Sequence, residues 1–455
     1  MSLDEYVLAF VMAGGRGTRL MNLTRYRTKP AVGILGYYRI WDFVATNVAN
    51  TGIPAMMVAI QFEPKSLTRH IGNGEIWGFD GADKNLDIVH PYEGGKKIIE
   101  FKGTADSVRK SMHRINRYNP RIVLVLGGDH VYTMTYNDVI KQHKNKNADA
   151  TIMVNAIPEN KASDFGIVRI DDEGRIIDFE EKPNPETSEG REIIEKFRLT
   201  KRQTERMNIK DPNLTHLGSM GNYVFFRDKL EDILNVYKGD DFGKNIIPLM
   251  KSDGKEIYAY VFEGYWKDVG KISDYFDCNI EFAENIALLD LIGNRVRTAL
   301  RHLPPARVSN GGNIKNSIIS PGDEIYGRVN KSVLGYQVIV EEGAEIKEGV
   351  LLGADRNEFY NNQLKRVFNT KIGKNSYLER VILDKNVQIG ENVRISPEAP
   401  VKERIAKLKA IGLEACTGED CPENTDVYID PKRGIFVLGK QQDTTKLIIP
   451  DNFEC

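Results

Sequence analysis

Short, strongly apolar runs alternate with stretches of helical periodicity along the first 275 residues. Helical patterns cover 41–52 and 104–118. Between them lie four aliphatic and β-branched runs with the character of buried strands, at residues 6–15, 54–60, 121–129 and 150–157. Strands that alternate with helices predict right-handed βαβ units and a mostly parallel, Rossmann-like sheet in an α/β fold. Ligands bind beyond the carboxyl ends of the strands in such sheets, so the segments after these runs are the candidate binding loops.

A six-residue period replaces this alternation after about residue 305. Aliphatic residues six positions apart fill the stretch at Val381, Val387 and Val393, and again at Ile389 and Ile395. Residues 317–353 carry the same pattern less regularly, and residues 356–368 interrupt it. Six-residue repeats are typical of a parallel β-helix, in which each hexad forms one face of a coil.

Two further segments define the expected organisation. Residues 282–303 have a helical pattern and end at two prolines, which mark a domain boundary. We therefore expect a sheet domain over 1–280, a helical linker over 281–305, and a β-helix domain with a C-terminal tail over 306–455. Residues 186–216 are highly charged and predict a solvated helical insertion, with a lid or a partner contact as the alternative.

Charge and composition exclude several classes of protein. The chain has 455 residues, with 63 Lys and Arg against 64 Asp and Glu, and this balance argues against a nucleic-acid binder. No apolar run approaches the roughly 18 residues that a transmembrane helix needs. The first residues include acids and lack a basic n-region, so we expect no signal peptide.

The four cysteines are too few for a disulfide framework. Cys416 and Cys421 could form half of a zinc site, but residues 400–455 contain no histidine and one further cysteine. We expect unpaired thiols in a cytoplasmic protein.

The strongest local motif is AGGRGTRL, which spans residues 13–20 directly after the first predicted strand. Gly14, Gly15 and Gly17 allow the backbone to approach phosphate oxygens, and successive N–H groups can form an anion-binding nest. Arg16 and Arg19 add delocalised positive charge that suits a polyphosphate. The motif is neither a Walker A loop nor a dinucleotide fingerprint.

Eight further motifs follow in order: LTRYRTKPAV (23–32), FKGTADSV (101–108), LGGDHVY (126–132), FGIVRID (165–171), FEEKP (179–183), LGSMGNYVF (217–225), DFGKNIIP (241–248) and YWKDVG (265–270). In this order and spacing the set resembles the bacterial glucose-1-phosphate adenylyltransferase family of sugar nucleotidyltransferases. That family also carries a C-terminal left-handed parallel β-helix, so the resemblance covers most of the chain. It implies synthesis of ADP-glucose and pyrophosphate from ATP and α-D-glucose 1-phosphate, for glycogen or a related α-glucan.

The resemblance also implies roles for individual residues. Arg16 and Lys29 match the phosphate-handling cations. Asp129 and Asp268 match two carboxylates that bind Mg²⁺, a hard cation that prefers oxygen ligands. Nucleotide contacts match Ala13, Gly14, Gly15, Gly17, Thr18, Arg19, Gly103, Thr104 and Ala105. Sugar-phosphate contacts match Gly166, Glu181, Lys182 and Ser219.

Some residues near these motifs have simpler structural interpretations. Asp106 could cap the helix that follows it. We interpret His130 as structural, because an already anionic sugar phosphate needs no imidazole base, and Trp266 as packing. Two positions depart from the family pattern: Lys102 stands where an aromatic residue is common, and Tyr26 replaces an activator-contacting lysine of some members. Sensitivity to activators is therefore not carried over.

Three other functions remain as alternatives to weigh. A related enzyme could use another NTP or another sugar phosphate. A non-catalytic regulatory paralogue is disfavoured because the cations and carboxylates named above are all present. An acyltransferase activity of the β-helix is rejected, because no histidine follows His302. By family analogy we expect a homotetramer, with no nucleic-acid or membrane partner.

Overall fold

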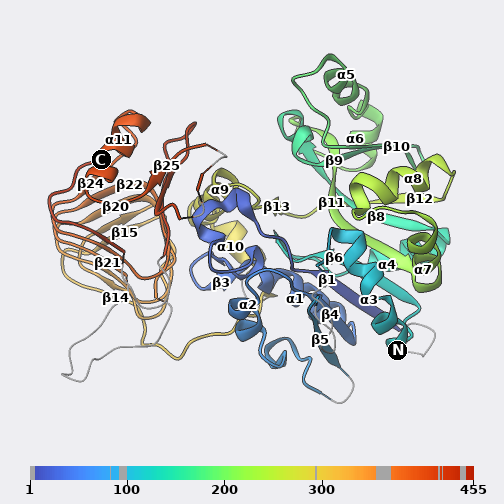
Figure 1. Cartoon of the computed structure of the whole chain (residues 1–455), viewed down its shortest axis with the longest axis horizontal. Coiled ribbons are helices and arrows are strands. Elements are labelled where there is room, and N and C mark those ends of the chain that lie inside the picture. The colour runs from blue at the N-terminus through green and yellow to red at the C-terminus, as the bar shows by residue number, and fades with distance from the viewer. Residues whose placement is uncertain are drawn as a thin grey trace. The chain divides into compact units, whose positions relative to one another are not determined.

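The computed structural model describes residues 6–81, 84–91, 100–292, 295–354, 370–418, 421–422, 424–440 and 447–455. The chain (Figure 1) forms two compact units, each made of three separate segments of the sequence. The first, here called the sheet unit, comprises Met1–Gly15, Val44–Gln61 and Gly72–Trp266. The second, here called the β-helix unit, comprises Arg16–Phe43, Phe62–Ile71 and Lys267–Cys455.

A nine-stranded sheet forms the centre of the sheet unit. Its main path runs β10-β9-β11-β6-β1-β4-β5, and β8 pairs with both β11 and β12. The strands are β1 (Val7–Met12), β4 (Ala55–Ala59), β5 (Asn85–Val89), β6 (Ile122–Gly127), β8 (Ala150–Pro158), β9 (Gly166–Ile170), β10 (Ile176–Glu181), β11 (Leu214–Phe226) and β12 (Ile257–Phe262).

The parallel part of this sheet is the part that the apolar runs predict. β1 pairs in parallel with β4 and β6, so that Phe10 lies opposite Met57 on one side and Val125 on the other. All three residues are fully buried, as expected for a parallel strand covered on both faces. β11 is antiparallel to β6, β8 and β9, and its register with β8 shifts between Ser219 and Asn222.

Helices flank this sheet and contribute to its core. α3 begins and ends where the periodicity predicts, and Val108 and Ile115 on its buried face join the core cluster. The helices are α1 (Ile40–Thr51), α3 (Thr104–Tyr118), α4 (Asn137–Lys146), α5 (Ser188–Lys196), α6 (Lys201–Arg206), α7 (Arg227–Val236) and α8 (Ile247–Ser252). The predicted insertion at 186–216 contains α5 and α6, but its last residues already belong to β11, and Met207 packs into the core.

The β-helix unit stacks short parallel strands into coils, orange to red in Figure 1. One ladder runs β14-β16-β19-β21-β23-β28, and a second runs β15-β17-β20-β22-β27. The strands are β14 (Arg307–Val308), β15 (Asn313–Lys315), β16 (Glu324–Ile325), β17 (Arg328–Asn330), β18 (Val333–Leu334), β19 (Val338–Val340), β20 (Glu345–Leu351), β21 (Thr370–Ile372), β22 (Tyr377–Leu383), β23 (Val387–Ile389), β24 (Arg394–Ile395), β25 (Ala415–Cys416), β26 (Val427–Ile429), β27 (Phe436–Leu438) and β28 (Leu447–Ile449).

The hexad residues fill the core of this helix, which confirms the β-helix prediction. Val381 and Val387 are fully buried, and Val393, Ile389 and Ile395 are no more than 3% exposed. The interruption at 356–368 lies outside the described residues. α11 (Val401–Ala410) follows the last hexads.

Segments from the first third of the chain also belong to the β-helix unit. They are η2 (Thr18–Thr24), η3 (Lys29–Ala31), β2 (Gly33–Ile34), β3 (Tyr38–Arg39) and α2 (Pro64–Ile71). Arg27 donates from Nη2 to both carboxylate oxygens of Asp384 at 2.6 Å, and both side chains are buried. Asn22 donates to the carbonyl oxygens of Asp426 and Val437 at 2.9 and 3.1 Å. The segment that follows the glycine-rich turn is therefore anchored on the β-helix.

The helix predicted over 282–303 is wrong in its bounds. α9 (Ile272–Glu284) starts ten residues earlier, and α10 (Ile286–Ile292) follows it directly. The side chain of Asn285 accepts a hydrogen bond from the N–H of Ala287, and this turn separates the two helices. Asn279 on α9 accepts from the N–H of Leu35, so the buried face of α9 packs on the N-terminal segment of the same unit.

The expectation of unpaired thiols is wrong for two of the four cysteines. Cys416 and Cys421 form a disulfide, and their Cα atoms are 5.8 Å apart, within the range that a disulfide spans. Cys278 and Cys455 are buried. Among the described residues, no helix is both long and apolar enough to cross a bilayer.

Candidate active site

The glycine-rich turn begins at the carboxyl end of β1. The N–H of Ala13 donates to the carbonyl of Ala59, which continues the β1–β4 pairing by one residue. Gly14 and Gly15 follow, and Gly15 is exposed. Gly17 has φ +67°, and a Cβ there would lie 3.0 Å from the Cβ of Lys29. The turn therefore needs glycine at 17, both for its left-handed conformation and to let the stem of Lys29 pass.

Three cationic side chains lie in this turn or next to it, and all three belong to the β-helix unit. The guanidinium of Arg16 lies 4.9 Å from the centre of the Phe62 ring, and Thr18 and Arg19 are exposed. Lys29 opens η3 and is almost completely buried. Its ammonium lies 2.9 Å from Oδ1 of Asp268, with 7% and 18% of the two side chains exposed. The sequence motifs thus bring a predicted phosphate-handling cation against a predicted metal ligand.

Asp129 lies in the turn between β6 and β7 (His130–Tyr132) in the sheet unit. The turn is held by the N–H of Gly127, which donates to the side chain of Asn222. The carboxylate of Asp129 is 36% exposed and lies 3.5 Å from Nε2 of His130. The His130 ring packs edge-on against Trp266 at 5.4 Å, which gives both rings a packing role. Trp266 opens β13 (Trp266–Asp268), two residues before Asp268.

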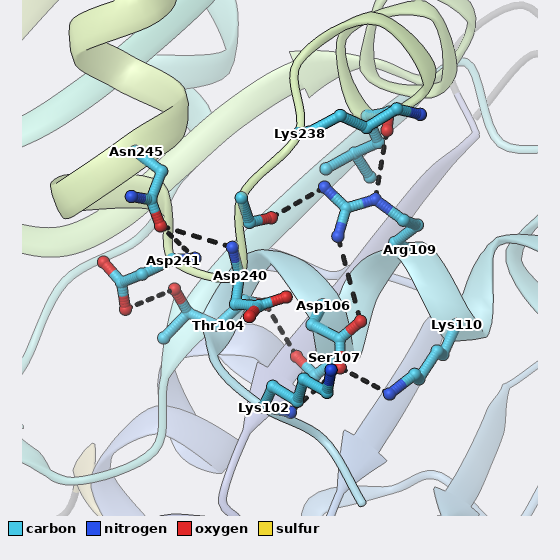
Figure 2. Close-up of polar contacts among 12 residues, drawn as sticks. Lys102, Thr104, Asp106, Ser107, Arg109, Lys110, Lys238, Asp240, Asp241 and Asn245 are labelled. Carbon is cyan, nitrogen blue, oxygen red and sulfur yellow. Dashed lines mark hydrogen bonds and ion pairs between the residues drawn. The ribbon is translucent and has the colours of Figure 1, made fainter. Parts of the chain in front are cut away.

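The GTAD turn packs against the loop that precedes η6 (Phe242–Ile246), as Figure 2 shows. The N–H groups of Ala105 and Asp106 both donate to the carbonyl of Asp240, at 2.8 and 3.0 Å. A Cβ at Gly103 would lie 2.3 Å from that carbonyl oxygen, so only glycine permits this approach. These first backbone N–H groups of α3 are therefore already hydrogen-bonded within the protein.

Thr104 links this turn to the carboxylate of Asp241. Its hydroxyl donates to Oδ2 of Asp241 at 3.0 Å and accepts from the N–H of Phe242 at 3.0 Å. Oδ1 of Asp241 accepts from the N–H of Lys244, and the side chain of Asn245 accepts from the N–H groups of Asp240 and Asp241 (Figure 2). The sequence motifs assigned no role to Asp241. The acidic residue directly before Phe-Gly in the motif DFGKNIIP is the feature that could have identified it.

Asp106 has a related but different function from the cap expected of it. Its Oδ2 accepts from the N–H of Lys102, the residue before the N-cap, and from Lys110 at 2.6 Å. Arg109 adds a weaker ion pair and donates to carbonyls at the end of α7 (Figure 2). The side chain thus fixes the entry into α3 while the helix's own first N–H groups use Asp240.

Glu181 ends β10 and lies in a space that two glycines leave for it. A Cβ at Gly166 or at Gly243 would lie 2.6 Å from its Oε2. Burial raises the pKa of the Glu181 carboxyl, and the nearby Asp241 raises it further, while Lys182 acts in the opposite direction. A carboxyl with a raised pKa beside a second carboxylate is the kind of group found at functional sites.

Lys182 and Ser219 complete the polar groups on this side of the sheet. Lys182 has φ +51°, an uncommon conformation for a residue other than glycine, and its ammonium lies 3.9 Å from Glu181. Its side chain is 47% exposed. Ser219 is nearly buried at the bulge of β11, where its hydroxyl accepts from the N–H of Gly221. Backbone strain at Lys182 is typical of residues held in place for a ligand.

Two family models match the chain. The Nucleotidyl transferase model matches residues 8–285, and the model of the GLGC left-handed parallel beta-helix domain matches residues 301–411. A glucose-1-phosphate adenylyltransferase of Acetivibrio thermocellus is 33% identical over 439 residues, 93% of each chain. The chain belongs to the glucose-1-phosphate adenylyltransferase family. The family and the fold class that the motifs predict are therefore confirmed.

Two other members of this family align over at least three quarters of this chain. The glucose-1-phosphate adenylyltransferase of Fervidobacterium nodosum is 35% identical over 436 residues, 93% of this chain and 95% of its own. That of Thermosipho africanus is 39% identical over 348 residues, 75% of this chain and 78% of its own. Nucleotidyl transferases generally use a divalent metal ion. Asp129 in the sheet unit and Asp268 in the β-helix unit each carry a carboxylate, the type of oxygen ligand that such an ion prefers.

Proposed function

We propose that the chain transfers the adenylyl group of ATP to α-D-glucose 1-phosphate, giving ADP-glucose and pyrophosphate. The observation that carries this proposal is the contact of Lys29 with Asp268 under the glycine-rich turn, where a phosphate-handling cation and a metal-binding carboxylate meet. The names of the family members above support the choice of base and sugar. The product is expected to serve synthesis of glycogen or a related α-glucan.

The chemistry requires positioning and charge stabilisation. The sugar phosphate is already anionic, so one of its oxygens can attack the α-phosphorus while the bond to pyrophosphate breaks, with no covalent protein intermediate. Arg16 and Lys29 stabilise the negative charge that develops on the leaving pyrophosphate. Asp129 and Asp268 would hold Mg²⁺, which would supply Lewis-acid stabilisation of the negative charge on the phosphates.

The remaining residues divide between the two substrates. The turn from Ala13 to Arg19 contacts the nucleotide, together with Gly103, Thr104 and Ala105. Gly166, Glu181, Lys182 and Ser219 hold the sugar phosphate. The carboxylates of Glu181 and Asp241 are suited to accept hydrogen bonds from sugar hydroxyls, and the ammonium of Lys182 is suited to the phosphate.

A panel of nucleoside triphosphates and sugar 1-phosphates, assayed with Mg²⁺, tests the proposal. ATP with glucose 1-phosphate should give the highest kcat/KM, and the reaction should run backwards with pyrophosphate. If another triphosphate is used more efficiently by about tenfold, or about 1.4 kcal/mol, the adenylyl assignment is wrong. Nucleotide binding without turnover of any pair would instead favour the regulatory paralogue.

We also propose a cytoplasmic homotetramer assembled through the β-helix. Stacked coils form a rigid rod with extended surfaces, which suits assembly. Light scattering of the full chain and of a chain cut near residue 305 tests this. An unchanged number of subunits after the cut would show that assembly does not depend on the β-helix.

A further inference from the structure

The ion pair between Lys29 and Asp268 joins two residues that the proposed reaction uses separately. Lys29 is expected to contact phosphate, and Asp268 is expected to contact the metal ion. In the structure they contact each other, with the ammonium 2.9 Å from Oδ1. The ammonium of a lysine side chain that is only 7% exposed needs a counter-ion, and the carboxylate of Asp268 provides it.

A second cation lies next to the same carboxylate. A Cβ built on Gly270 would lie 3.0 and 3.1 Å from the two oxygens of Asp268 and 3.1 Å from Nη2 of Arg19. The carboxylate of Asp268 therefore has an ammonium in contact with it and a guanidinium nearby, and all three groups belong to the β-helix unit. A divalent ion that binds Asp268 in this arrangement meets the repulsion of two positive charges at short range.

The stem of Lys29 is fixed, whereas its ammonium is the group that can change partners. Gly17 packs against Cβ of Lys29, and the hydroxyl of Thr24 donates to the carbonyl of Gly17, so the turn and the lysine stem form one packed block. The four-carbon side chain ends in a compact charge with three donors, which can turn toward an arriving phosphate without movement of the backbone.

We propose that Lys29 occupies the metal-binding carboxylate of Asp268 until the phosphates of the nucleotide take the lysine over. The proposal rests on the proposed function, and it adds an order of events. The free protein binds a divalent cation weakly, because the ammonium competes for Asp268. The nucleotide phosphates attract Lys29, so Asp268 becomes available for the metal ion that accompanies the nucleotide. Nucleotide and metal then bind with positive coupling, and the coupling passes through one lysine.

Binding of Mn²⁺ alone to the full chain, without nucleotide, tests this by calorimetry and by the signal of free Mn²⁺ in electron paramagnetic resonance. Lys29→Gln removes the competing charge and should strengthen Mn²⁺ binding by about tenfold, a change that the loss of one nearby unit charge can produce. Lys29→Met, which keeps the apolar stem, should do the same and serves if the glutamine variant does not fold. Lys29→Arg keeps the charge and should remain as weak as the wild type.

Two comparisons make the result specific to this contact. Lys196→Gln removes a lysine that pairs with Asp178 on the sheet unit, and it should leave Mn²⁺ affinity unchanged. In an Asp268→Asn background, Lys29→Gln should have no effect, because the carboxylate for which the two cations compete has lost its charge. Equal Mn²⁺ affinity of the wild type and both neutral variants would overturn the proposal. So would the same gain in the Asp268→Asn background.

The measurement needs no substrate, so its result is independent of the proposed function. A chain that makes no ADP-glucose could still show the gain in Mn²⁺ affinity. A chain that makes ADP-glucose but shows no gain would retain the proposed function and lose this inference.

Discussion

The two compact units hold their polar clusters in opposite ways. In the sheet unit, the carboxylates of Glu181 and Asp241 lie near each other, and backbone N–H groups and one hydroxyl fix Asp241. In the β-helix unit, two buried ion pairs join Arg27 to Asp384 and Lys29 to Asp268. In the first cluster, Lys182 lies 3.9 Å from Glu181 and only partly offsets the effect of burial, whereas the two pairs in the β-helix unit are in direct contact.

This difference suits the two kinds of ligand that the proposed function assigns to the clusters. Carboxylates held at fixed positions can accept several hydrogen bonds from the hydroxyls of a sugar. Ion pairs can exchange partners with a polyphosphate and its metal ion, because each charge is already placed and the substrate brings the complementary ones. Substitutions of the paired ions should therefore affect turnover and stability, and substitutions around Glu181 should affect sugar affinity and pH response.

The largest effect is expected from Asp129→Asn and Asp268→Asn, one substitution in each unit. Each keeps the side-chain shape but removes a charge that holds the metal ion. We expect kcat to fall by about 10²–10⁴, or roughly 3–5 kcal/mol of transition-state stabilisation. Steady-state kinetics at saturating substrate and Mg²⁺ would measure the loss.

The double variant decides whether the two carboxylates act together. Residues that act as a unit are not additive, so the double variant should be little worse than either single one. If Asp129 only stabilises its turn and Asp268 only neutralises Lys29, the variants should keep near-normal turnover and lose thermal stability instead. Thermal melts of the same three proteins separate the two outcomes.

The next effect concerns stability alone. Arg27→Met leaves the fully buried Asp384 without its guanidinium partner, which should cost about 3–5 kcal/mol of unfolding free energy. The matched change in the sheet unit, Arg169→Met, breaks a partly exposed pair with Asp178 and should cost about 1 kcal/mol or less. Urea titrations of both variants give the comparison. Equal losses would show that burial does not distinguish the pairs.

Much of the fold could be predicted from the sequence, because the apolar residues that recur with a regular period are the residues that the structure buries. The run at 121–129 gives β6, the pattern at 104–118 gives α3, and the hexads give the β-helix core. The assignment of residues 16–43 to the β-helix unit could not be predicted in this way. It depends on contacts such as Arg27 with Asp384, which are 357 positions apart, and no local pattern records them.

The motifs identify the candidate site residues, but they do not predict which residues these contact in the folded chain. Lys29 and Asp268 stand in separate motifs, and only the folded chain brings them to 2.9 Å. Asp241 received no role, because its importance comes from Thr104 and Glu181, which lie on other elements. The disulfide of Cys416 with Cys421 requires their Cα atoms to lie close together, which composition does not predict.

A smaller effect is expected from Lys182→Ala in the sheet unit. The ammonium can make a charge-assisted hydrogen bond to the sugar phosphate, worth roughly 1.5–3 kcal/mol. The apparent constant for glucose 1-phosphate should rise accordingly, while that for ATP should change much less. Lys196→Ala, on the surface helix α5, is the control and should change neither. A constant for the sugar phosphate that matches the wild type would remove Lys182 from the sugar site.

The smallest expected effect is a pH dependence of stability that comes from Glu181. The charge of its carboxylate is only partly offset by Lys182. Burial raises the pKa of the Glu181 carboxyl above its value in the unfolded chain, and Asp241 acts in the same direction. The folded state therefore holds this proton more tightly than the unfolded state does. The resulting stability is fully present below the unfolded pKa and is lost as pH rises through the folded pKa.

Glu181→Gln imitates the protonated side chain at every pH, so its melting temperature should match that of the wild type below the unfolded pKa. The difference should grow as pH rises toward the folded pKa and stay constant above it. Melts of both proteins from about pH 4 to pH 8 would measure this, across the range in which a raised carboxyl pKa falls. Glu192→Gln, an exposed change on α5, corrects for the general loss of one negative charge. A constant difference between Glu181→Gln and the wild type at all pH values would mean that Glu181 is not destabilised by its charge. Such a result would also contradict the contrast between the carboxylate cluster of the sheet unit and the ion pairs of the β-helix unit. That contrast depends on Glu181, because its burial is not offset by a full counter-charge.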